Sequence, residues 1–187
     1  MSLTSLDPNT ALVVIDLQNG IVALPAVHPI ADVIERASAL TEAFRRHKLP
    51  VVLVNVAGGA PGRTEQPPRT GTPPADWATL IPQLDRQPTD LTVTKKTWGA
   101  FTATALADRL KALDVTQVVL AGVATSIGVE STARQAFELG FNVTLAVDAM
   151  NDLNADAHAN SVARIFPRLG ETGTTQQIVD LLNARSA

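Results

Sequence analysis

The sequence of 187 residues contains no cysteine, and this absence excludes disulfide bonds, thiolate metal sites and a cysteine nucleophile. It also contains no apolar run near the roughly 20 residues of a membrane span, and no basic N-terminal region followed by an apolar stretch. Basic residues form no block longer than a pair such as Arg45-Arg46. We therefore expect a cytoplasmic protein whose partners include neither a membrane nor nucleic acid.

What is present is a regular alternation of two patterns. Apolar runs typical of buried parallel strands are followed by segments with apolar residues at helical spacing. Strands are predicted at 11–15, 50–56, 91–94, 118–121 and 142–147, with residues 170–173 as a connection or a very short sixth strand. Helices are predicted at 30–47, 102–113, 129–139, about 154–168 with Pro167 at its end, and 175–182 after a capping box at Thr174.

This order predicts one domain over residues 1–187, with a three-layer α/β/α Rossmann-like fold and a mostly parallel sheet of about six strands. Residues 57–74 interrupt the alternation with a long segment rich in glycine and proline. Loops of this length are usually lids, subunit contacts or mobile segments. Partly for that reason we expect a homo-oligomer, a dimer or a tetramer.

The most informative stretch runs from Gln117 to Gly140. An apolar β-branched run stops at Gly122, small and polar residues follow, and a helical pattern then continues until Gly140 can cap it. This pattern predicts a strand, a tight bend and a helix. In a parallel sheet such a bend lies at the carboxyl end of a strand, where helix N-terminal N–H groups face a ligand.

Two charged residues are predicted to meet at that edge. Asp16 follows the first strand, and Lys95 follows the third. Taken alone, Asp16 suits a turn or cap, and Lys95 suits a solvated strand end. Together they offer a proton acceptor and an electrostatic clamp, and we expect the lysine to hold the aspartate ionised.

Three motifs occur in order along the chain: Ala11-Leu-Val-Val-Ile-Asp16-Leu-Gln-Asn, Val93-Thr-Lys95 with Ala100-Phe101 beyond it, and Gly122-Val-Ala-Thr125 followed by Glu130-Ser-Thr-Ala-Arg134. With these motifs the chain resembles the isochorismatase-like hydrolases, a family that includes nicotinamidases and N-carbamoylsarcosine amidase. The resemblance extends over nearly the whole sequence. The resemblance implies a catalytic triad at the positions of Asp16, Lys95 and Gly128, with Lys95 preferred to Lys96 by its distance to Phe101. It also implies a cis peptide at Val123-Ala124 that helps to form an oxyanion hole.

Glycine stands at position 128 where amidase members of that family carry the nucleophilic cysteine. Ser126 and Ser131 are the nearest hydroxyls, but their spacing points them elsewhere and no histidine is near in sequence. Isochorismatases also carry glycine there and hydrolyse a vinyl ether by protonation from the aspartic acid. This chain differs from them at Ala124 and Ser126, and in Val56-Ala57-Gly58, so isochorismate itself is not the expected substrate.

The sequence therefore predicts a hydrolase of a vinyl ether or C–N bond in a small anionic molecule, with Asp16 as general acid or base, Lys95 as electrostatic partner and no covalent thiol intermediate. An inactive family member that binds a small carboxylate or serves as an oligomeric binding protein is the alternative, and amide hydrolysis by water beside Gly128 ranks third. The predicted substrate contacts are Trp98, Phe101, Ala124, Thr125 and Ser126.

Other candidate residues are assigned structural roles. Trp77 follows the long loop and is predicted at a loop or subunit contact rather than at the substrate. His28, His47 and His158 lie in separate segments and are interpreted as surface or packing residues. Because residues 57–74 contain no aspartate or histidine, we expect no metal, and no other cofactor is indicated.

Overall fold

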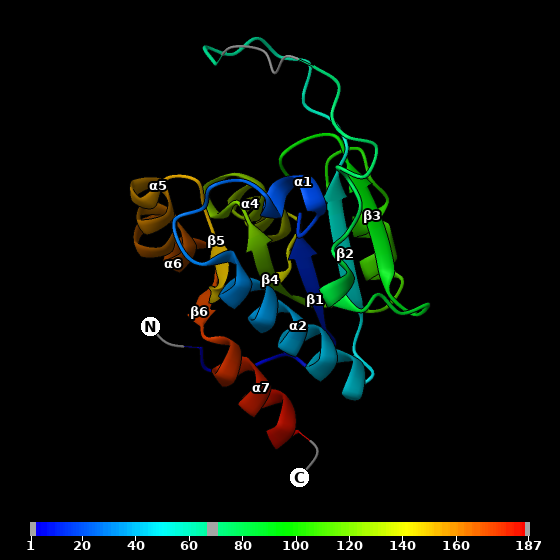
Figure 1. Ribbon diagram of the computed structural model, residues 1–187. Coiled ribbons are helices and arrows are strands. Elements are labelled where there is room, and N and C mark those ends of the chain that lie inside the picture. The colour runs from blue at the N-terminus through cyan, green and yellow to red at the C-terminus, as the bar shows by residue number, and fades with distance from the viewer. Residues whose placement is uncertain (1–2, 67–70, 186–187) are drawn as a thin grey trace.

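Six parallel strands lie at the centre of the molecule (Figure 1). The computed structural model describes residues 3–66 and 71–185. The strands run in the order β3-β2-β1-β4-β5-β6, and every neighbouring pair is parallel. Their bounds are β1 (Thr10–Ile15), β2 (Val51–Val56), β3 (Leu91–Lys95), β4 (Gln117–Val123), β5 (Asn142–Asn151) and β6 (Glu171–Gly173). The predicted α/β/α fold, including the short sixth strand, is confirmed.

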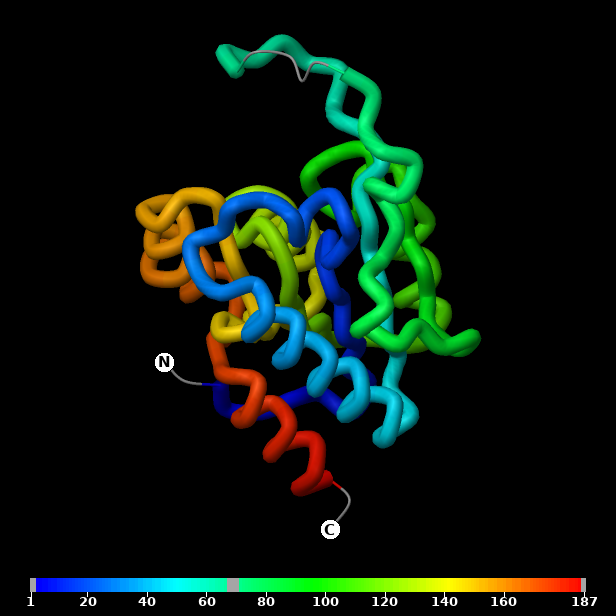
Figure 2. The backbone as a smooth tube through the Cα atoms, viewed as in Figure 1, coloured from blue at the N-terminus to red at the C-terminus, as the bar shows by residue number. Residues whose placement is uncertain are grey.

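Helices cover both faces of this sheet. On one face lie α2 (Ile30–Arg46) and α7 (Thr175–Ala184), in front of the strands in Figure 1. The other helices are α1 (Asn19–Val22), α3 (Leu106–Lys111), α4 (Glu130–Glu138), α5 (Ala155–Asn160) and α6 (Phe166–Leu169). Figure 2 shows the chain beyond β2 projecting outward from the carboxyl edge of the sheet, whereas α7 lies toward the opposite edge.

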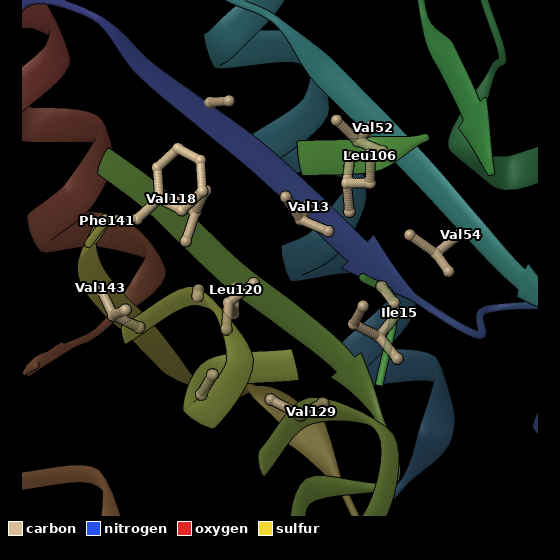
Figure 3. Close-up of a cluster of buried hydrophobic side chains, with 14 of the residues drawn as sticks. Val13, Ile15, Val52, Val54, Leu106, Val118, Leu120, Val129, Phe141 and Val143 are labelled. Carbon is tan, nitrogen blue, oxygen red and sulfur yellow. The ribbon is translucent and has the colours of Figure 1, made fainter. Parts of the chain in front are cut away.

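The side chains of β1 alternate between two buried layers. Ala11, Val13 and Ile15 belong to the core that includes residues of α3 and α4 (Figure 3). Leu12 and Val14 belong to the core that includes residues of α2 and α7. All five side chains are at most 1% exposed, because the central strand of a parallel sheet is covered on both sides. This double burial explains the continuous apolar run in the sequence.

Gly122 allows the last residues of β4 to lie very close to the end of β1. Its φ of +116° lies where side-chain-bearing residues are rarely found, and an added Cβ would come within 2.0 Å of the Ile15 carbonyl oxygen. Gly122 pairs with Ile15 in the sheet register, directly before Asp16. The glycine therefore brings the bend after β4 beside the end of β1.

Strands β4 and β5 are longer than predicted. The register between them shifts between Leu120 and Gly122, and pairing then resumes at Gly122 with Met150 and at Val123 with Asn151. This irregularity carries β5 through residues that the sequence pattern assigned to a loop. The apolar run alone did not reveal it, because the continuation of β5 includes the polar residues Asp148 and Asn151.

One helix prediction was wrong at its ends. The helix expected at 102–113 forms only at Leu106–Lys111, because the Thr104 hydroxyl donates to the Ala100 carbonyl at 2.6 Å and accepts the Leu106 N–H at 3.3 Å. The helix expected at about 154–168 is confirmed to within one residue: α5, a π-helical stretch and α6 continue from Ala155 to Leu169, with Pro167 in the first turn of α6 near the end.

The remaining local predictions can be compared directly. Thr174 and Gln177 form the expected capping box at the start of α7. In the long loop, residues 57–66 and 71–76 are exposed, and residues 67–70 of that prediction lie outside the described residues. Within 3–66 and 71–185, no helix combines the length and apolarity needed to cross a membrane.

Candidate active site

Asp16 and Lys95 form a buried ion pair at the carboxyl edge of the sheet. Lys95 Nζ donates to Asp16 Oδ2 at 2.7 Å and to the Thr97 carbonyl oxygen at 3.2 Å. Asp16 is 4% exposed and Lys95 2%. Asp16 follows β1 with a φ of 52°, a left-handed conformation that aspartate accepts more readily than most residues. Strand β2 lies between β1 and β3, so the lysine reaches across it to the aspartate.

Burial dominates the electrostatics of this pair. It raises the pKa of Asp16 from its ordinary value of 3.8 to about 6, although the charge and the hydrogen bond of Lys95 act to lower that pKa. The expectation that the lysine would simply hold the aspartate ionised was therefore incomplete. Oδ1 of the same carboxyl group is buried and finds no hydrogen-bond partner among residues 3–66 and 71–185. One oxygen of the carboxyl group is thus buried without a partner among these residues, and the group titrates at about pH 6.

The bend after β4 lies against this carboxyl group. Its Val123-Ala124 peptide is cis, as the resemblance implied, and Thr125–Val129 form a π-helical stretch that leads into α4. At Gly128, a Cβ would lie 3.3 Å from Asp16 Oδ2 and 3.0 Å from Ile15 Cγ2. Gly128 is buried and lies directly beside Asp16, so even a methyl group there would crowd the carboxylate.

A cavity of about 470 Å³ opens above these three residues. Its walls are mostly apolar and include Ile21, Leu24, Trp77, Trp98, Ile127 and Leu153. Among the described residues that line it, Asp16 and Lys95 carry the only charged side chains. A volume of this size fits a small molecule, and apolar walls with a few polar groups are typical of ligand pockets.

Five of the predicted site residues line the cavity: Asp16, Lys95, Trp98, Ala124 and Gly128. The structure does not bring the other three, Phe101, Thr125 and Ser126, to its wall. The Phe101 ring stacks on Phe141 at 5.9 Å within the hydrophobic core. Thr125 is fully buried and donates to the Asn151 carbonyl oxygen at 3.0 Å, and the Ser126 N–H donates to Asp152 Oδ2 at 2.6 Å.

Trp77 lines the cavity, although the sequence favoured a loop or subunit contact. Its carbonyl oxygen accepts the Gly20 N–H at 2.9 Å and the Gln18 side-chain amide at 3.1 Å. The ring lies so close to Gly20 that a Cβ there would meet it at 2.0 Å. Gly20, shortly after the first strand, was the one signal in the sequence that a large side chain packs against this turn.

The histidines are not as separate as their sequence positions suggested. The rings of His28 and His158 meet edge to face at 5.2 Å, and His158 Nδ1 lies 2.9 Å from Thr125 Oγ1. Burial, followed by the neighbouring His28, lowers the pKa of His158, and Asp152 opposes that shift. Within the described part of the chain, no three His, Cys, Asp or Glu side chains converge as a metal site would require.

Comparison with known proteins decides the family. The model of the isochorismatase domain matches residues 10–177, which include all six strands and every residue of the ion pair and bend. The chain belongs to the isochorismatase-like hydrolase family. Members of this family act on small molecules, in agreement with the size of the cavity.

Individual family members resemble the chain over most of its length. The isochorismatase family protein YwoC of Bacillus subtilis is 41% identical over 178 residues, covering 91% of this chain and 93% of the relative. Nicotinamidase 3 of Arabidopsis thaliana is 32% identical over 163 residues, covering 81% and 79%. The structure of an isochorismatase family protein from Burkholderia thailandensis superposes with a TM-score of 0.92 at 41% identity, covering 97% of this chain and all of that one.

Replacing Lys95 by methionine should destabilise the protein in a pH-dependent manner. Without the ammonium group, the pKa of the buried Asp16 should rise further above 6, and the folded state should bind a proton that the unfolded state releases near pH 3.8. Stability should therefore fall as pH rises, and the deficit relative to wild type should grow from little at about pH 5 to roughly 3 kcal/mol at about pH 8.

Urea unfolding at the two pH values measures this difference. Lys96→Met is the matched control, because Lys96 is the adjacent lysine but is exposed. It should show little change at either pH. A Lys95→Met deficit of equal size at both pH values would contradict the coupling between the lysine and the titration of Asp16.

Proposed function

We propose that this protein is a hydrolase in which Asp16 exchanges a proton with a small substrate and no covalent enzyme intermediate forms. The observation that supports this proposal is the buried Asp16 carboxyl group, which faces the cavity, pairs with Lys95 and has a pKa raised to about 6. A catalytic acid or base works best when its pKa lies near the working pH. No cysteine is present to act as a nucleophile.

In the favoured reaction Asp16 acts as a general acid on a vinyl ether. The protonated carboxyl group gives its proton to the enol carbon, and the resulting carboxylate is stabilised by Lys95 at 2.7 Å. Water then adds to the oxocarbenium carbon and gives a proton back to the Asp16 carboxylate, and the neutral hemiketal breaks down to the alcohol and a carbonyl compound. This reaction needs Asp16 first as the carboxylic acid and then as the carboxylate. Near neutral pH the Asp16–Lys95 pair can adopt both protonation states, because the pKa of Asp16 is about 6.

Charge balance in the site limits the substrate. When Asp16 is protonated, Lys95 becomes an uncompensated cation, so the acid form of the site matches one negative charge on a small molecule. Because the other described lining residues are uncharged, the rest of that molecule should be apolar. We therefore propose a small substrate with at most one carboxylate, a narrower class than the anionic molecule expected from the sequence.

Hydrolysis of an amide is a second candidate, favoured by the 32% identity to the Arabidopsis protein named nicotinamidase 3. In this reaction the Asp16 carboxylate would take a proton from a water molecule that attacks the carbonyl carbon. Gly128 places no side chain against Asp16 Oδ2, where a Cβ would lie at 3.3 Å. A homo-oligomer also remains a prediction for this chain.

Asp16→Asn should lower kcat by about 100- to 10,000-fold on any substrate that the wild-type protein hydrolyses, because the amide cannot exchange the proton. Isochorismate, related enol-pyruvyl ethers and simple amides are the substrates to screen. For the vinyl ether reaction, kcat/KM should fall as pH rises through about 6, since the protonated form is the active one. The amide reaction should show the opposite dependence.

Asp90→Asn is the matched control, because Asp90 also forms an ion pair at 2.7 Å, with Arg45, but this pair is only partly buried and lies at the amino end of β3. Its kcat should stay within about threefold of wild type. An Asp16→Asn protein with wild-type turnover would contradict the proposed role. Absence of wild-type turnover on every substrate, with retained binding, would favour the inactive binding protein.

Gly128→Cys should abolish native turnover and leave a thiol that reacts slowly with iodoacetamide. The new side chain would start 3.3 Å from Asp16 Oδ2 and occupy the space where water or substrate lies in our proposal, and the adjacent carboxylate should disfavour the thiolate. The variant would contain the only cysteine in the chain, so alkylation can be followed by mass alone.

Gly62→Cys provides the control, since a Cβ at this exposed loop position meets no atom within 4 Å. Its thiol should be alkylated rapidly, with turnover unchanged. If Gly128→Cys were alkylated as fast as Gly62→Cys and kept full native turnover, the small size of Gly128 would have no part in function.

A further inference from the structure

Thr132 connects the bend at Gly128 to the segment that follows Lys95. Its side chain is fully buried near the start of α4. The hydroxyl group donates to the Gly128 carbonyl oxygen at 2.7 Å and accepts the Ala100 N–H at 3.1 Å. Thr132 does not line the cavity. Any effect of its hydroxyl group on the site would therefore be indirect, through Gly128 and Ala100.

Only one of the two hydrogen bonds is ordinary for a helix. Threonine often donates to the carbonyl four residues earlier, and the bond to Gly128 has that spacing. The bond from Ala100 instead joins residues 32 positions apart. Ala100 is fully buried, and a buried N–H that loses its partner costs free energy. This second bond therefore fixes the position of the segment relative to the helix.

That segment also holds the catalytic lysine of the proposed mechanism. The Thr97 carbonyl oxygen accepts the Lys95 ammonium at 3.2 Å, and the Thr97 hydroxyl donates to the Gly99 carbonyl oxygen at 3.1 Å. Trp98 lies between these residues, lines the cavity and is 62% exposed. The short turn is thus held by Lys95 at one end and by Thr132 at the other.

Gln135 strengthens the attachment three residues further along α4. Its Oε1 accepts the Phe101 N–H at 3.1 Å, and its Nε2 donates to the Thr102 hydroxyl at 2.5 Å. Residues 132 and 135 share one helix face because of their spacing. Neither bond is explained by helix formation, since both partners lie in the turn before α3.

We propose that Thr132 is a positioning residue that sets the placement of the Lys95 ammonium and Trp98 relative to Gly128. The proposal rests on the proposed function for its effect on turnover. Its effect on the order of Trp98 does not depend on any substrate. The two effects can therefore be tested separately.

Thr132→Val removes the hydroxyl at nearly constant volume, whereas Thr132→Ser keeps it. Trp77 and Trp98 are the only tryptophans of the chain, so in a Trp77→Phe background the fluorescence reports Trp98 alone. Thr132→Val should increase the fast local motion of Trp98, seen as a lower fluorescence anisotropy. In the natural background it should lower kcat/KM by roughly 10- to 100-fold, and Thr132→Ser should restore both quantities.

Thr144→Val is the matched control, because Thr144 is also fully buried and accepts a hydrogen bond, from Gln117 Nε2 at 3.0 Å in the core. The Thr144→Val variant should unfold at a lower urea concentration than wild type, while the fluorescence anisotropy of Trp98 stays unchanged. If Thr132→Val behaves like this control, with lower stability but unchanged Trp98 and kcat/KM, the proposal is overturned.

Two further outcomes are decisive in the same design. If the wild-type protein hydrolyses none of the screened substrates, the proposed function fails, but a change in Trp98 anisotropy still supports the positioning role and an unchanged value overturns it. If Thr132→Val does not fold, Gln135→Met tests the same attachment at a half-buried position. Unchanged Trp98 anisotropy in that variant would then overturn the proposal.

Discussion

Burial of the Asp16–Lys95 ion pair is the constraint on which the arrangement of the site depends. Removing two charges from water costs several kcal/mol, and an ion pair at 2.7 Å in the interior recovers that cost only with good geometry and further hydrogen bonds. Lys95 has a second acceptor in the Thr97 carbonyl oxygen, but Asp16 Oδ1 has no partner among the described residues. Such incomplete satisfaction of a buried carboxyl group is costly for stability, and our proposed function uses the proton that this group exchanges.

The topology explains why these groups meet. In the order β3-β2-β1-β4-β5-β6, the direction of chain progression reverses between β1 and β4, and the crevice at such a switch point is the usual ligand site of an open parallel sheet. Asp16 directly follows β1 on one side of the crevice, and the bend that contains Gly128 follows β4 on the other side. Gly122 permits their close approach, because any Cβ at this position would strike the Ile15 carbonyl oxygen.

Much of this arrangement could be predicted from the sequence because both faces of the sheet are buried. Apolar runs locate buried strands, and polar residues directly after them locate the carboxyl edge. Asp16, Lys95 and the bend after Gly122 could be predicted in that way, whereas the family motifs were needed to select Lys95 over Lys96 and to identify Gly128. The extension of β5 could not be predicted from the sequence. Its pairing with the part of β4 that follows Leu120 depends on a register shift, which leaves no periodic signal.

Side-chain direction was the harder part of the prediction. Phe101 was predicted as a substrate contact, but its ring stacks on Phe141 in the hydrophobic core. Trp77 reaches the cavity through hydrogen bonds to Gln18 and Gly20, more than fifty residues earlier. His28 and His158 meet because the chain before α2 is hydrogen-bonded to Asn151 at the end of β5, while His158 in α5 contacts Thr125 in the bend after β4. These contacts depend on three-dimensional packing that local pattern does not encode.

The central claim is that the Asp16 carboxyl group, buried against Lys95, can gain and lose a proton near neutral pH. An NMR titration of the Asp16 carboxyl carbon measures this directly and needs no substrate, with the Asp16→Asn spectrum assigning the signal. Our account predicts a midpoint at about 6 in the wild-type protein. A midpoint near the ordinary aspartate value of 3.8 would contradict it, because the carboxyl group would then be permanently ionised at neutral pH.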